Sequence, residues 1–387
     1  MEEVRPYWAW LQLALGAGSF KPKRILSYFP DIPAFYEAGM VQWRSIGMFT
    51  PKELQRLEQY TVQDGAALLE DGAQKGVRIL TPAYVGYPKR LWQLENPPCL
   101  LYIKGRLPDV DAGPALAVVG TRNATETGRQ IAYDLSMQLA QAGMVIISGG
   151  AKGIDTAAHL GALEGGGQSI CVLGCGILYP YLMENEAIRN RIAQSGAVVS
   201  EFALETPAFR QNFPIRNRII SGLAVGVLVV EAAERSGSLI TAATALEQNR
   251  DVFAVPCGIY NPVSEGVNNL LKAGAKPVTK AQDILEEYAA YGLRAPQTDS
   301  RPPQQERQLH QEPVLRKSAQ KRTPRMVLPE LSPEAAKVLE QLSTEPMLLE
   351  QLQAGTGLPV QTILIAVTEL ELCGVVQSYS GGRYSLT

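Results

Sequence analysis

Strand-like and helix-like segments alternate along residues 112–280, and this alternation limits most strongly how the chain can fold. Short apolar runs of strand length are separated by longer segments whose apolar residues recur at helical spacing. Such alternation gives parallel strands, because each crossover connection places a helix on a face of the sheet. The pattern predicts a doubly wound, Rossmann-like α/β domain. Its predicted segments are 115–119, 125–142, 144–148, 154–163, 169–173, 184–195, 197–201, 215–223, 225–231, 239–248 and 251–255.

Two loops that follow predicted strands have the composition of phosphate-binding loops. Residues 148–159, with the sequence SGGAKGIDTAAH, join a buried strand to a helix rich in small residues. Glycines there expose backbone N–H groups, and the start of the helix adds positive dipole. Gly120-Thr121-Arg122 breaks an earlier strand and places an arginine beside the first loop. Either loop alone is ordinary turn chemistry, but the two together favour a site at the carboxyl ends of the strands.

The standard nucleotide and metal motifs do not occur in the chain. A dinucleotide site needs GxGxxG and a later acidic residue, whereas residues 120–125 read GTRNAT; the GxxxxGK[ST] motif is also missing. We therefore predict no cofactor, and a polyanion held by several separate loops is the remaining candidate. Five cysteines without a CxxC pair and two histidines predict no metal site. His159 is expected to be a packed, hydrogen-bonded residue rather than a base.

A third motif, and the order in which the motifs follow one another along the chain, indicate a family resemblance. Residues 212–223 read NFPIRNRIISGL and precede the buried strand at 226–231, which runs into SGSLITAA at 236–243. Together with the two glycine loops, these motifs resemble the DprA (Smf) family of bacterial DNA-processing proteins over residues 80–280. One departure is the sequence Val-Pro-Cys-Gly at 255–258, where the family usually has Val-Pro-Gly.

The residues at the strand ends favour a protein that binds single-stranded DNA and is not an enzyme. The resemblance further implies that the protein protects incoming single strands during natural transformation and loads the RecA recombinase onto strands covered by single-strand-binding protein. From the residues themselves we expect basic groups on phosphates and Phe213 stacked on a base. The candidate DNA-binding residues are Gly120, Arg122, Ser148, Gly149, Lys152, Gly153, Phe213, Arg216, Asn217, Arg218, Ser236 and Ser238.

The resemblance also implies a homodimer that forms through the Rossmann-like domain near its last helix, at 266–273. Val267, Leu270 and Leu271 are the apolar residues of that segment and the candidates for the dimer interface. Packing of the same residues in the core of one protomer is the competing interpretation.

Two other classes of protein remain as alternatives. A nucleotide-processing enzyme of the lysine-decarboxylase-like, phosphoribohydrolase fold would carry Pro-Gly-Gly-x-Gly-Thr and a following glutamate after the strand at 226–231. Residues 232–239 read AAERSGSL instead, which leaves Glu231 as the one candidate acid. A pure adaptor protein whose DNA contact is incidental is the second alternative.

The predicted domain at 76–290 is flanked by smaller parts on both sides. Residues 1–75 suggest helices at 7–15, 22–28, 32–38 and 51–60 and resemble a SAM-like or helix-hairpin-helix module, with a packing role as the alternative. The tryptophans at 8, 10 and 43 are expected in its core. No signal peptide or membrane span is recognised, which favours the cytoplasm.

Charge divides the C-terminal part of the chain into two segments. Residues 300–325 carry seven basic and two acidic residues with almost no apolar ones, so 291–326 is predicted to be a disordered basic linker. Residues 327–387 suggest three helices and a closing hairpin, the pattern of a winged helix. Residues 326–387 have a net charge of −5, which argues against strong binding to DNA phosphates and favours a protein contact or a structural role.

Overall fold

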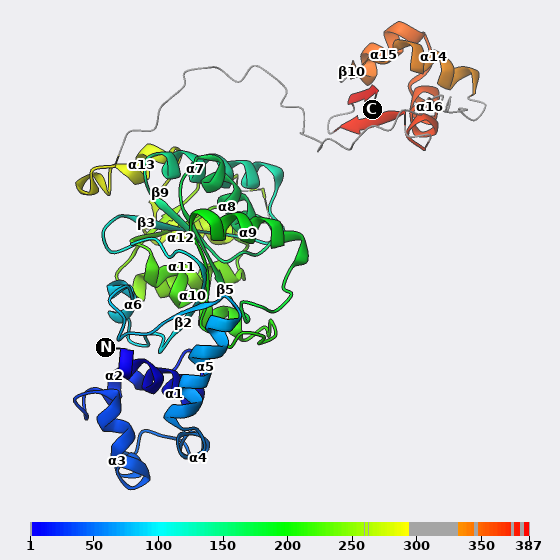
Figure 1. Ribbon diagram of the computed structural model, residues 1–387. Coiled ribbons are helices and arrows are strands. Elements are labelled where there is room, and N and C mark those ends of the chain that lie inside the picture. Colours follow the sequence, from blue (N-terminus) through cyan, green and yellow to red (C-terminus); the bar gives the residue numbers. More distant parts are fainter. Residues whose placement is uncertain are drawn as a thin grey trace, which may run out of the picture. The chain divides into compact units, whose positions relative to one another are not determined.

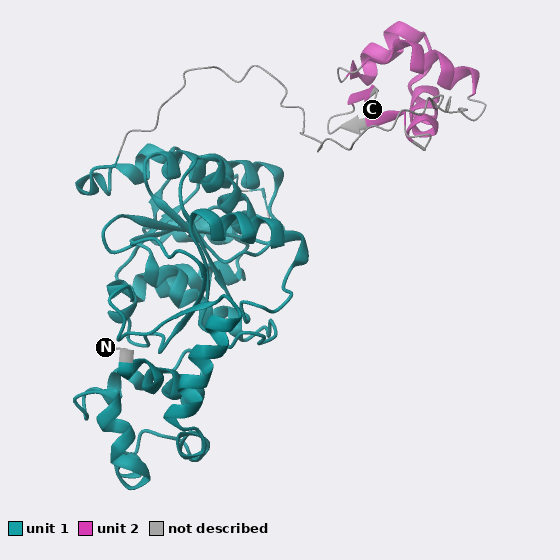
Figure 2. Ribbon diagram, in the orientation of Figure 1, with its two compact units in different colours: residues 1–301 teal, residues 302–387 magenta. Residues whose placement is uncertain are grey.

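The computed structural model describes residues 2–258, 260–261, 263–293, 332–343, 347–372, 375–379 and 383–386. The chain divides into two compact units, residues 1–301 and 302–387 (Figure 2). The predicted boundary between residues 75 and 76 falls inside the first unit. Beyond residue 293, the predicted linker at 291–326 lies outside the described residues.

A nine-stranded sheet forms the centre of the first unit, with the order β1-β2-β6-β5-β4-β3-β7-β8-β9. All neighbours from β6 to β9 are parallel, which confirms the predicted doubly wound sheet. β1 and β2 extend it as an antiparallel edge that the sequence did not predict. The strands are β1 (Arg78–Leu80), β2 (Leu101–Gly105), β3 (Ala115–Val119), β4 (Val145–Ser148), β5 (Ser169–Leu173), β6 (Ala197–Ser200), β7 (Gly226–Val229), β8 (Asp251–Ala254) and β9 (Lys276–Pro277).

Helices cover both faces of this sheet, as the crossover rule requires (Figure 1). On β3, Ala117 belongs to the core beneath α10, whereas Val118 belongs to the core beneath α7. One face carries α7 (Glu126–Gln141), α8 (Ile154–Glu164), α9 (Glu186–Ser195) and α13 (Ala281–Leu285), and the other α6 (Lys89–Trp92), α10 (Asn212–Leu223), α11 (Gly237–Glu247) and α12 (Glu265–Lys272). Short 3-10 turns occur at Glu2–Val4, Met183–Asn185 and Ala289–Tyr291.

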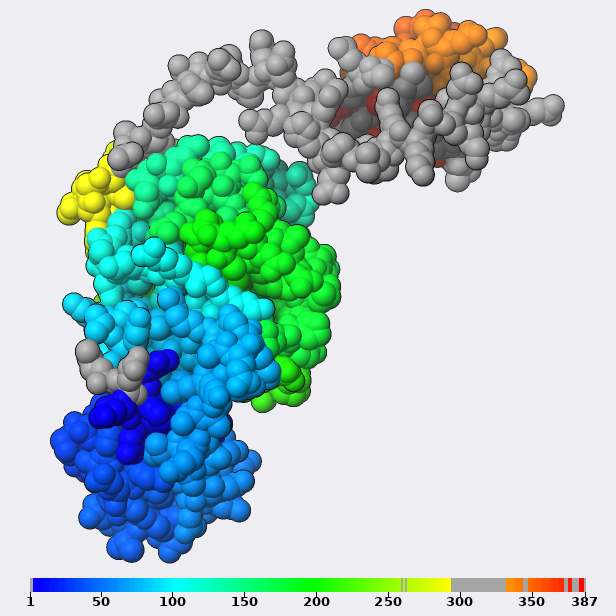
Figure 3. Space-filling model, in the orientation of Figure 1, coloured from blue at the N-terminus to red at the C-terminus, as the bar shows by residue number. Residues whose placement is uncertain are grey.

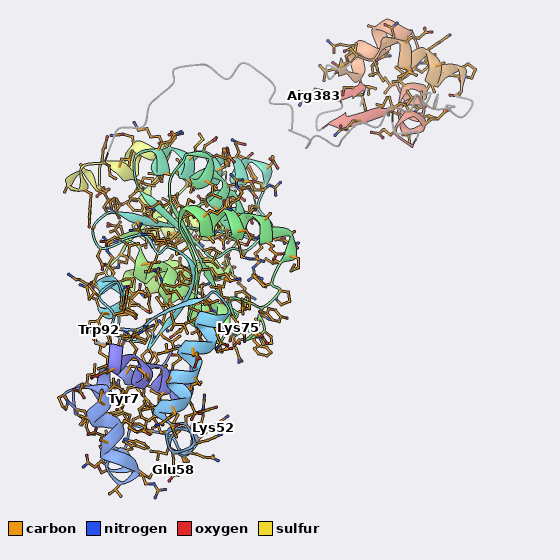
Figure 4. The ribbon with its side chains drawn as sticks, in the orientation of Figure 1. Tyr7, Lys52, Glu58, Lys75, Trp92 and Arg383 are labelled. Carbon is orange, nitrogen blue, oxygen red and sulfur yellow. The ribbon has the colours of Figure 1, made fainter. Side chains whose placement is uncertain are left out.

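Five N-terminal helices pack beside the sheet within the first unit. They are α1 (Arg5–Leu15), α2 (Lys21–Ile25), α3 (Ile32–Ser45), α4 (Pro51–Gln59) and α5 (Val62–Gln74), of which α5 was not predicted. Trp8, Trp10 and Trp43 are buried, which confirms their predicted core role. Trp8 meets Trp92 of α6 edge to face, with 5.9 Å between ring centroids, and Figure 4 labels Trp92 at this junction. Figure 3 shows the N-terminal helices and the following segment as one continuous surface.

The second unit has the predicted winged-helix composition of three helices and a hairpin. Its helices are α14 (Pro333–Gln341), α15 (Leu349–Thr356) and α16 (Val360–Leu372). β11 (Val376–Tyr379) and β12 (Arg383–Leu386) form the hairpin, and β10 (Met347–Leu348) adds a short third strand. Val338, Ile363 and Leu370 form part of its own apolar core. In the parts of both units that the structure describes, no helix has the length and apolar character to span a bilayer.

Candidate nucleic-acid groove

A groove of about 1240 Å³ opens beyond the carboxyl ends of β3 and β7. The chain leaves β3 toward β4 on one side, and β7 later pairs with the other side of β3. This reversal of strand order is the switch point at which open α/β sheets bind their ligands. Seven of the twelve predicted DNA-binding residues line the groove: Gly120, Arg122, Phe213, Arg216, Asn217, Ser236 and Ser238.

Two arginines and a tyrosine are among the groove residues that the sequence analysis did not predict. Arg210 and Arg235 line the groove with exposed side chains, and Tyr181 supplies a second aromatic ring. Both arginines flank motifs that had been recognised, so their proximity to 212–223 and 236–243 was an available signal. With Arg122 they make three exposed groove arginines, against the one exposed carboxylate of Glu234, so the exposed charge favours a polyanion.

Phe213 lies half-buried in the first turn of α10, with basic and aromatic groups around its ring. The guanidinium carbon of Arg122 is 4.9 Å from the ring centroid, and that of Arg216 is 5.8 Å away. The ring of Tyr181 is 5.8 Å away at an interplanar angle of 48°. The following Pro214 is accepted because a first helical turn lacks intrahelical partners for its N–H groups. The groove thus combines an aromatic ring with positive charge.

Arg216 holds the floor of the groove together instead of projecting into solvent. Its side chain is almost entirely buried, with 4% of the residue exposed. Nη1 donates hydrogen bonds to the carbonyl oxygens of Gly149, at 2.7 Å, and of Val172. Burial lowers the pKa of Arg216, an effect opposed by the nearby carboxylate of Asp155. Burial likewise raises the pKa of Asp155, and Arg216 opposes this shift. Arg216 therefore ties α10 to the ends of β4 and β5.

The glycine-rich loop after β4 does not form the open phosphate cradle that we expected. Ser148 is fully buried, and its Oγ donates to the carbonyl oxygen of Val118 at 2.6 Å. The Ile154 N–H at the start of α8 donates to the Thr121 carbonyl oxygen at 3.3 Å. Gly153 has a φ of +78°, and a Cβ there would lie 2.4 Å from the same oxygen. The β3 loop therefore covers the helix start that was predicted to face a phosphate.

The structure also corrects the expectation for Arg218, because its guanidinium is buried and does not line the groove. Its Nη2 lies 2.5 Å from Glu201 Oε2, and the two side chains are only 6% and 2% exposed. Glu201 Oε1 in turn accepts a hydrogen bond from the backbone N–H of Gly18. This buried ion pair joins α10 to the N-terminal helices. Gly149 lies buried against Arg216, and neither residue 149 nor 218 lines the groove.

Lys152 and Gly153 lie on a different cavity, which is smaller and separate from the groove. Lys152 is exposed, and its Nζ lies 2.6 Å from Glu184 Oε1. Five of the twelve predicted DNA-binding residues therefore do not line the groove: Ser148, Gly149, Lys152, Gly153 and Arg218.

The two residues considered for acid-base chemistry have structural partners. His159 is buried with Nδ1 2.8 Å from Ser169 Oγ, and burial lowers its pKa to about 3, which confirms the predicted packed role. Glu231 accepts hydrogen bonds from the backbone N–H and the hydroxyl of Thr125, at 2.9 and 2.5 Å. It therefore anchors the start of α7. Within the described ranges, no group of three or more metal-ligating side chains is placed to hold an ion.

The three residues predicted at the dimer interface differ in how much surface they expose to a second copy of the chain. Val267 is fully buried in the core of its own protomer and presents no surface, which corrects its assignment to an interface. Leu270 and Leu271 are partly buried against the same core and keep some exposed surface.

Comparisons with known proteins agree with these features. Residues 78–289 match the family of DNA recombination-mediator protein A, and residues 322–382 match the DprA winged helix domain. The chain is 33% identical over 389 residues to Protein Smf of Synechocystis, covering 98% of each. It is 40% identical over 306 residues to Protein Smf of Escherichia coli, covering 78% of this chain and 75% of that protein.

Two solved structures of DNA processing protein A resemble the chain. That of Streptococcus pneumoniae has a TM-score of 0.63 and 34% identity, covering 72% of this chain and 95% of that one. That of Helicobacter pylori has a TM-score of 0.50 and 30% identity, covering 55% and 96%. The Helicobacter structure was described for its single-stranded DNA binding mode.

Proposed function

Because the chain belongs to the DprA (Smf) family, we propose that it binds single-stranded DNA in the groove beyond β3 and β7. The observation that carries this proposal is the meeting of Arg122 with the Phe213 ring in a groove that Arg210 and Arg235 also line. Single-strand binding combines a positively charged groove with aromatic platforms, and both are found here. The relative from Helicobacter pylori supports the choice of ligand.

The groove favours single strands over duplex because its aromatic ring can stack only on an unpaired base. Stacking is tolerant of sequence, since every base has a π-face, so little sequence preference is expected. Basic groups on three different loops suit a flexible backbone, whose successive phosphates can follow the groove. We propose a binding role and not a catalytic one, which is supported by the recombination-mediator family and by the structural hydrogen bonds of Glu231 and His159.

Within the family role of recombination mediator, the protein protects incoming single strands in the cytoplasm during natural transformation. It also loads the RecA recombinase onto strands covered by single-strand-binding protein, and it works as a homodimer. The support for these finer functions is the family membership. Recombinase filament formation on covered strands, with and without this protein, tests the loading role. Sedimentation of the protein alone tests the dimer, and unchanged filament formation would reject the loading role.

A titration with labelled oligothymidylate and with a duplex of equal length, at several salt concentrations, tests the DNA-binding proposal. Three exposed groove arginines, at 122, 210 and 235, predict a slope of log affinity against log salt of about −2 for single strands. Single strands should bind more tightly than duplex at every salt concentration. A slope near zero, or preference for duplex, would contradict the proposal.

A further inference from the structure

The smaller cavity, of about 310 Å³, lies between α7 and α8, and we call it the α7–α8 pocket. Its inner wall is apolar and consists mainly of the side chains of Tyr133, Ala157 and Leu160. Gln130 and Asn185 add amide groups to this wall. An apolar cavity with a few fixed polar groups is the usual form of a small-ligand site. A planar, partly polar ring such as a nucleobase matches that combination.

The polar part of the pocket is held in a fixed orientation. Asn185 is buried, and its Nδ2 donates hydrogen bonds to Thr156 Oγ1 at 3.0 Å and to the Gly150 carbonyl oxygen at 3.3 Å. Thr156 Oγ1 itself donates to the carbonyl oxygen of Ala151 at 2.7 Å. Such a network fixes the amide before any ligand arrives, which lowers the entropic cost of binding.

One short segment separates the pocket from the groove. Ala151 and Asp155 line the groove, whereas Lys152, Gly153 and Thr156 line the pocket. The loop that carries Arg122 packs directly on Gly153, because a Cβ there would lie 2.6 Å from the Arg122 carbonyl oxygen. The two cavities therefore neighbour each other across residues 151–156 and the Arg122 loop.

Two exposed ion pairs stand at the edge of the pocket. Lys152 lies 2.6 Å from Glu184, and Arg129 lies 2.5 Å from Glu126. Exposed pairs of this kind contribute little to stability, so exchanging a carboxylate for a phosphate costs little. Lysine binds phosphate as a compact charge, and arginine can do so with two parallel hydrogen bonds. The edge can therefore hold the phosphate of a nucleotide whose base enters the pocket.

We propose that the α7–α8 pocket binds one nucleoside unit of the same DNA strand that occupies the groove. The base packs against Tyr133 and Leu160, and the adjoining phosphate contacts Lys152. The proposal rests on the proposed single-strand binding in the groove. It extends the binding site around the Arg122 loop, so strands long enough to reach both cavities bind more tightly than strands that fill the groove alone.

The test compares oligothymidylates of increasing length on the full chain and on the variant Leu160→Trp, which fills the pocket. We expect the variant to match the parent protein on the shortest strands that bind and to lose about tenfold in affinity on longer ones. Leu246→Trp is the matched control, because Leu246 is exposed on α11 and lines neither cavity. This control should follow the parent protein at every length.

A second variant keeps the test decisive if Leu160→Trp lowers the melting temperature. Lys152→Gln changes an exposed side chain and should weaken only the longer strands, with a salt slope smaller by about 0.7 for those strands alone. Equal weakening at all lengths would place Lys152 in the groove and overturn the assignment of the pocket.

The remaining outcomes show whether binding at the pocket fails independently of binding at the groove. They also show whether the pocket binds part of a strand or a free nucleotide. Identical length dependence in Leu160→Trp and in the parent protein overturns the pocket but leaves the groove intact. Thymidine monophosphate that binds the parent protein and is lost in Leu160→Trp, without any change for long strands, shows a free-nucleotide site and also overturns the proposal. A parent protein that binds no single strand of any length defeats both proposals together.

Discussion

The guanidinium of Arg122 lies over the ring of Phe213, with 4.9 Å between its Cζ and the ring centroid. The contact joins the loop after β3 to the first turn of α10 at the point where the groove opens. A cation over an aromatic face gains about 0.5–1 kcal/mol at exposed sites, so the contact holds both side chains in place. The pair thus presents positive charge and an aromatic surface to the same ligand.

The first prediction concerns the shape of the Arg122 side chain. Arg122→Lys should weaken single-strand binding less than Arg122→Ala, because lysine keeps the charge but loses the forked donors and the stacking surface. Only the alanine variant should reduce the salt slope, by about 0.7. Anisotropy titrations at several salt concentrations measure both quantities. Equal affinity of the lysine and arginine proteins would show that charge alone acts here.

The second prediction separates stacking from charge at Phe213. Phe213→Ala should cost about 1–3 kcal/mol of binding free energy and leave the salt slope unchanged, because no counterion release is lost. Its half-buried ring lines the groove, so the melting temperature should fall much less than for a core phenylalanine, whose truncation costs about 3–5 kcal/mol. Melting and binding should be measured on the same sample. Unchanged affinity with an unchanged melting temperature would reject stacking.

The third prediction distinguishes two arginines that line the same groove. Arg216→Met should lower the free energy of unfolding by about 2–4 kcal/mol, because it removes the donor to the Gly149 and Val172 carbonyl oxygens and the positive charge near the Asp155 carboxylate. Arg210→Met is the matched control on an exposed side chain. It should preserve stability and reduce the salt slope of DNA binding. Denaturant unfolding of both variants tests the contrast, and similar losses of stability would refute it.

The fourth prediction follows from the buried His159. Its pKa is about 3 in the folded protein and about 6.5 when unfolded, so between these values the unfolded chain binds the extra proton. The His159 contribution to stability is therefore complete above pH 6.5 and is lost as the pH falls toward 3. Between pH 6.5 and 3, this contribution to the free energy of unfolding falls by about 1.4 kcal/mol per pH unit.

The variant His159→Asn, which can still hydrogen-bond to Ser169, should show a shallower loss of stability from pH 6.5 to 5. His310→Asn is the control, since sequence places it in the predicted linker. Urea unfolding at a series of pH values measures the slopes. A parent-like slope in the His159 variant would show that this residue does not carry the acid sensitivity.

The fifth prediction concerns the second unit. Among its described residues, Lys337 and Arg383 are the basic side chains, with Arg383 labelled in Figure 4, against five glutamates. The exposed residues of α16 include Val360, Leu364 and Ile365, which carry no charge. Deleting residues 326–387 should therefore leave single-strand affinity within a few-fold of that of the full chain. A large loss of affinity on deletion would show that the geometry of this unit outweighs its charge.

The sequence predicted those parts of the fold that local patterns encode. β3 and β5 begin and end where the apolar runs do, and α7, α8 and α11 start within two residues of their predicted positions. Apolar spacing and strand length are local properties, so a single chain displays them. β1 and β2 were missed because short edge strands acquire their identity by pairing, here with each other and with β6. The capping box of Thr61 and Asp64 was an available signal for α5.

The same distinction between local patterns and long-range contacts applies to the candidate site. The motifs by themselves determined that glycine loops and arginines stand at the ends of strands, and the switch-point rule then located the groove. Only the tertiary structure decided which arginines face the groove and which are used inside the protein. Arg122 is exposed over Phe213, Arg216 spans the ends of β4 and β5, and Arg218 is neutralised by Glu201. The reason is physical: a buried charge requires a partner, and the partners of Arg216 and Arg218 come from distant parts of the chain.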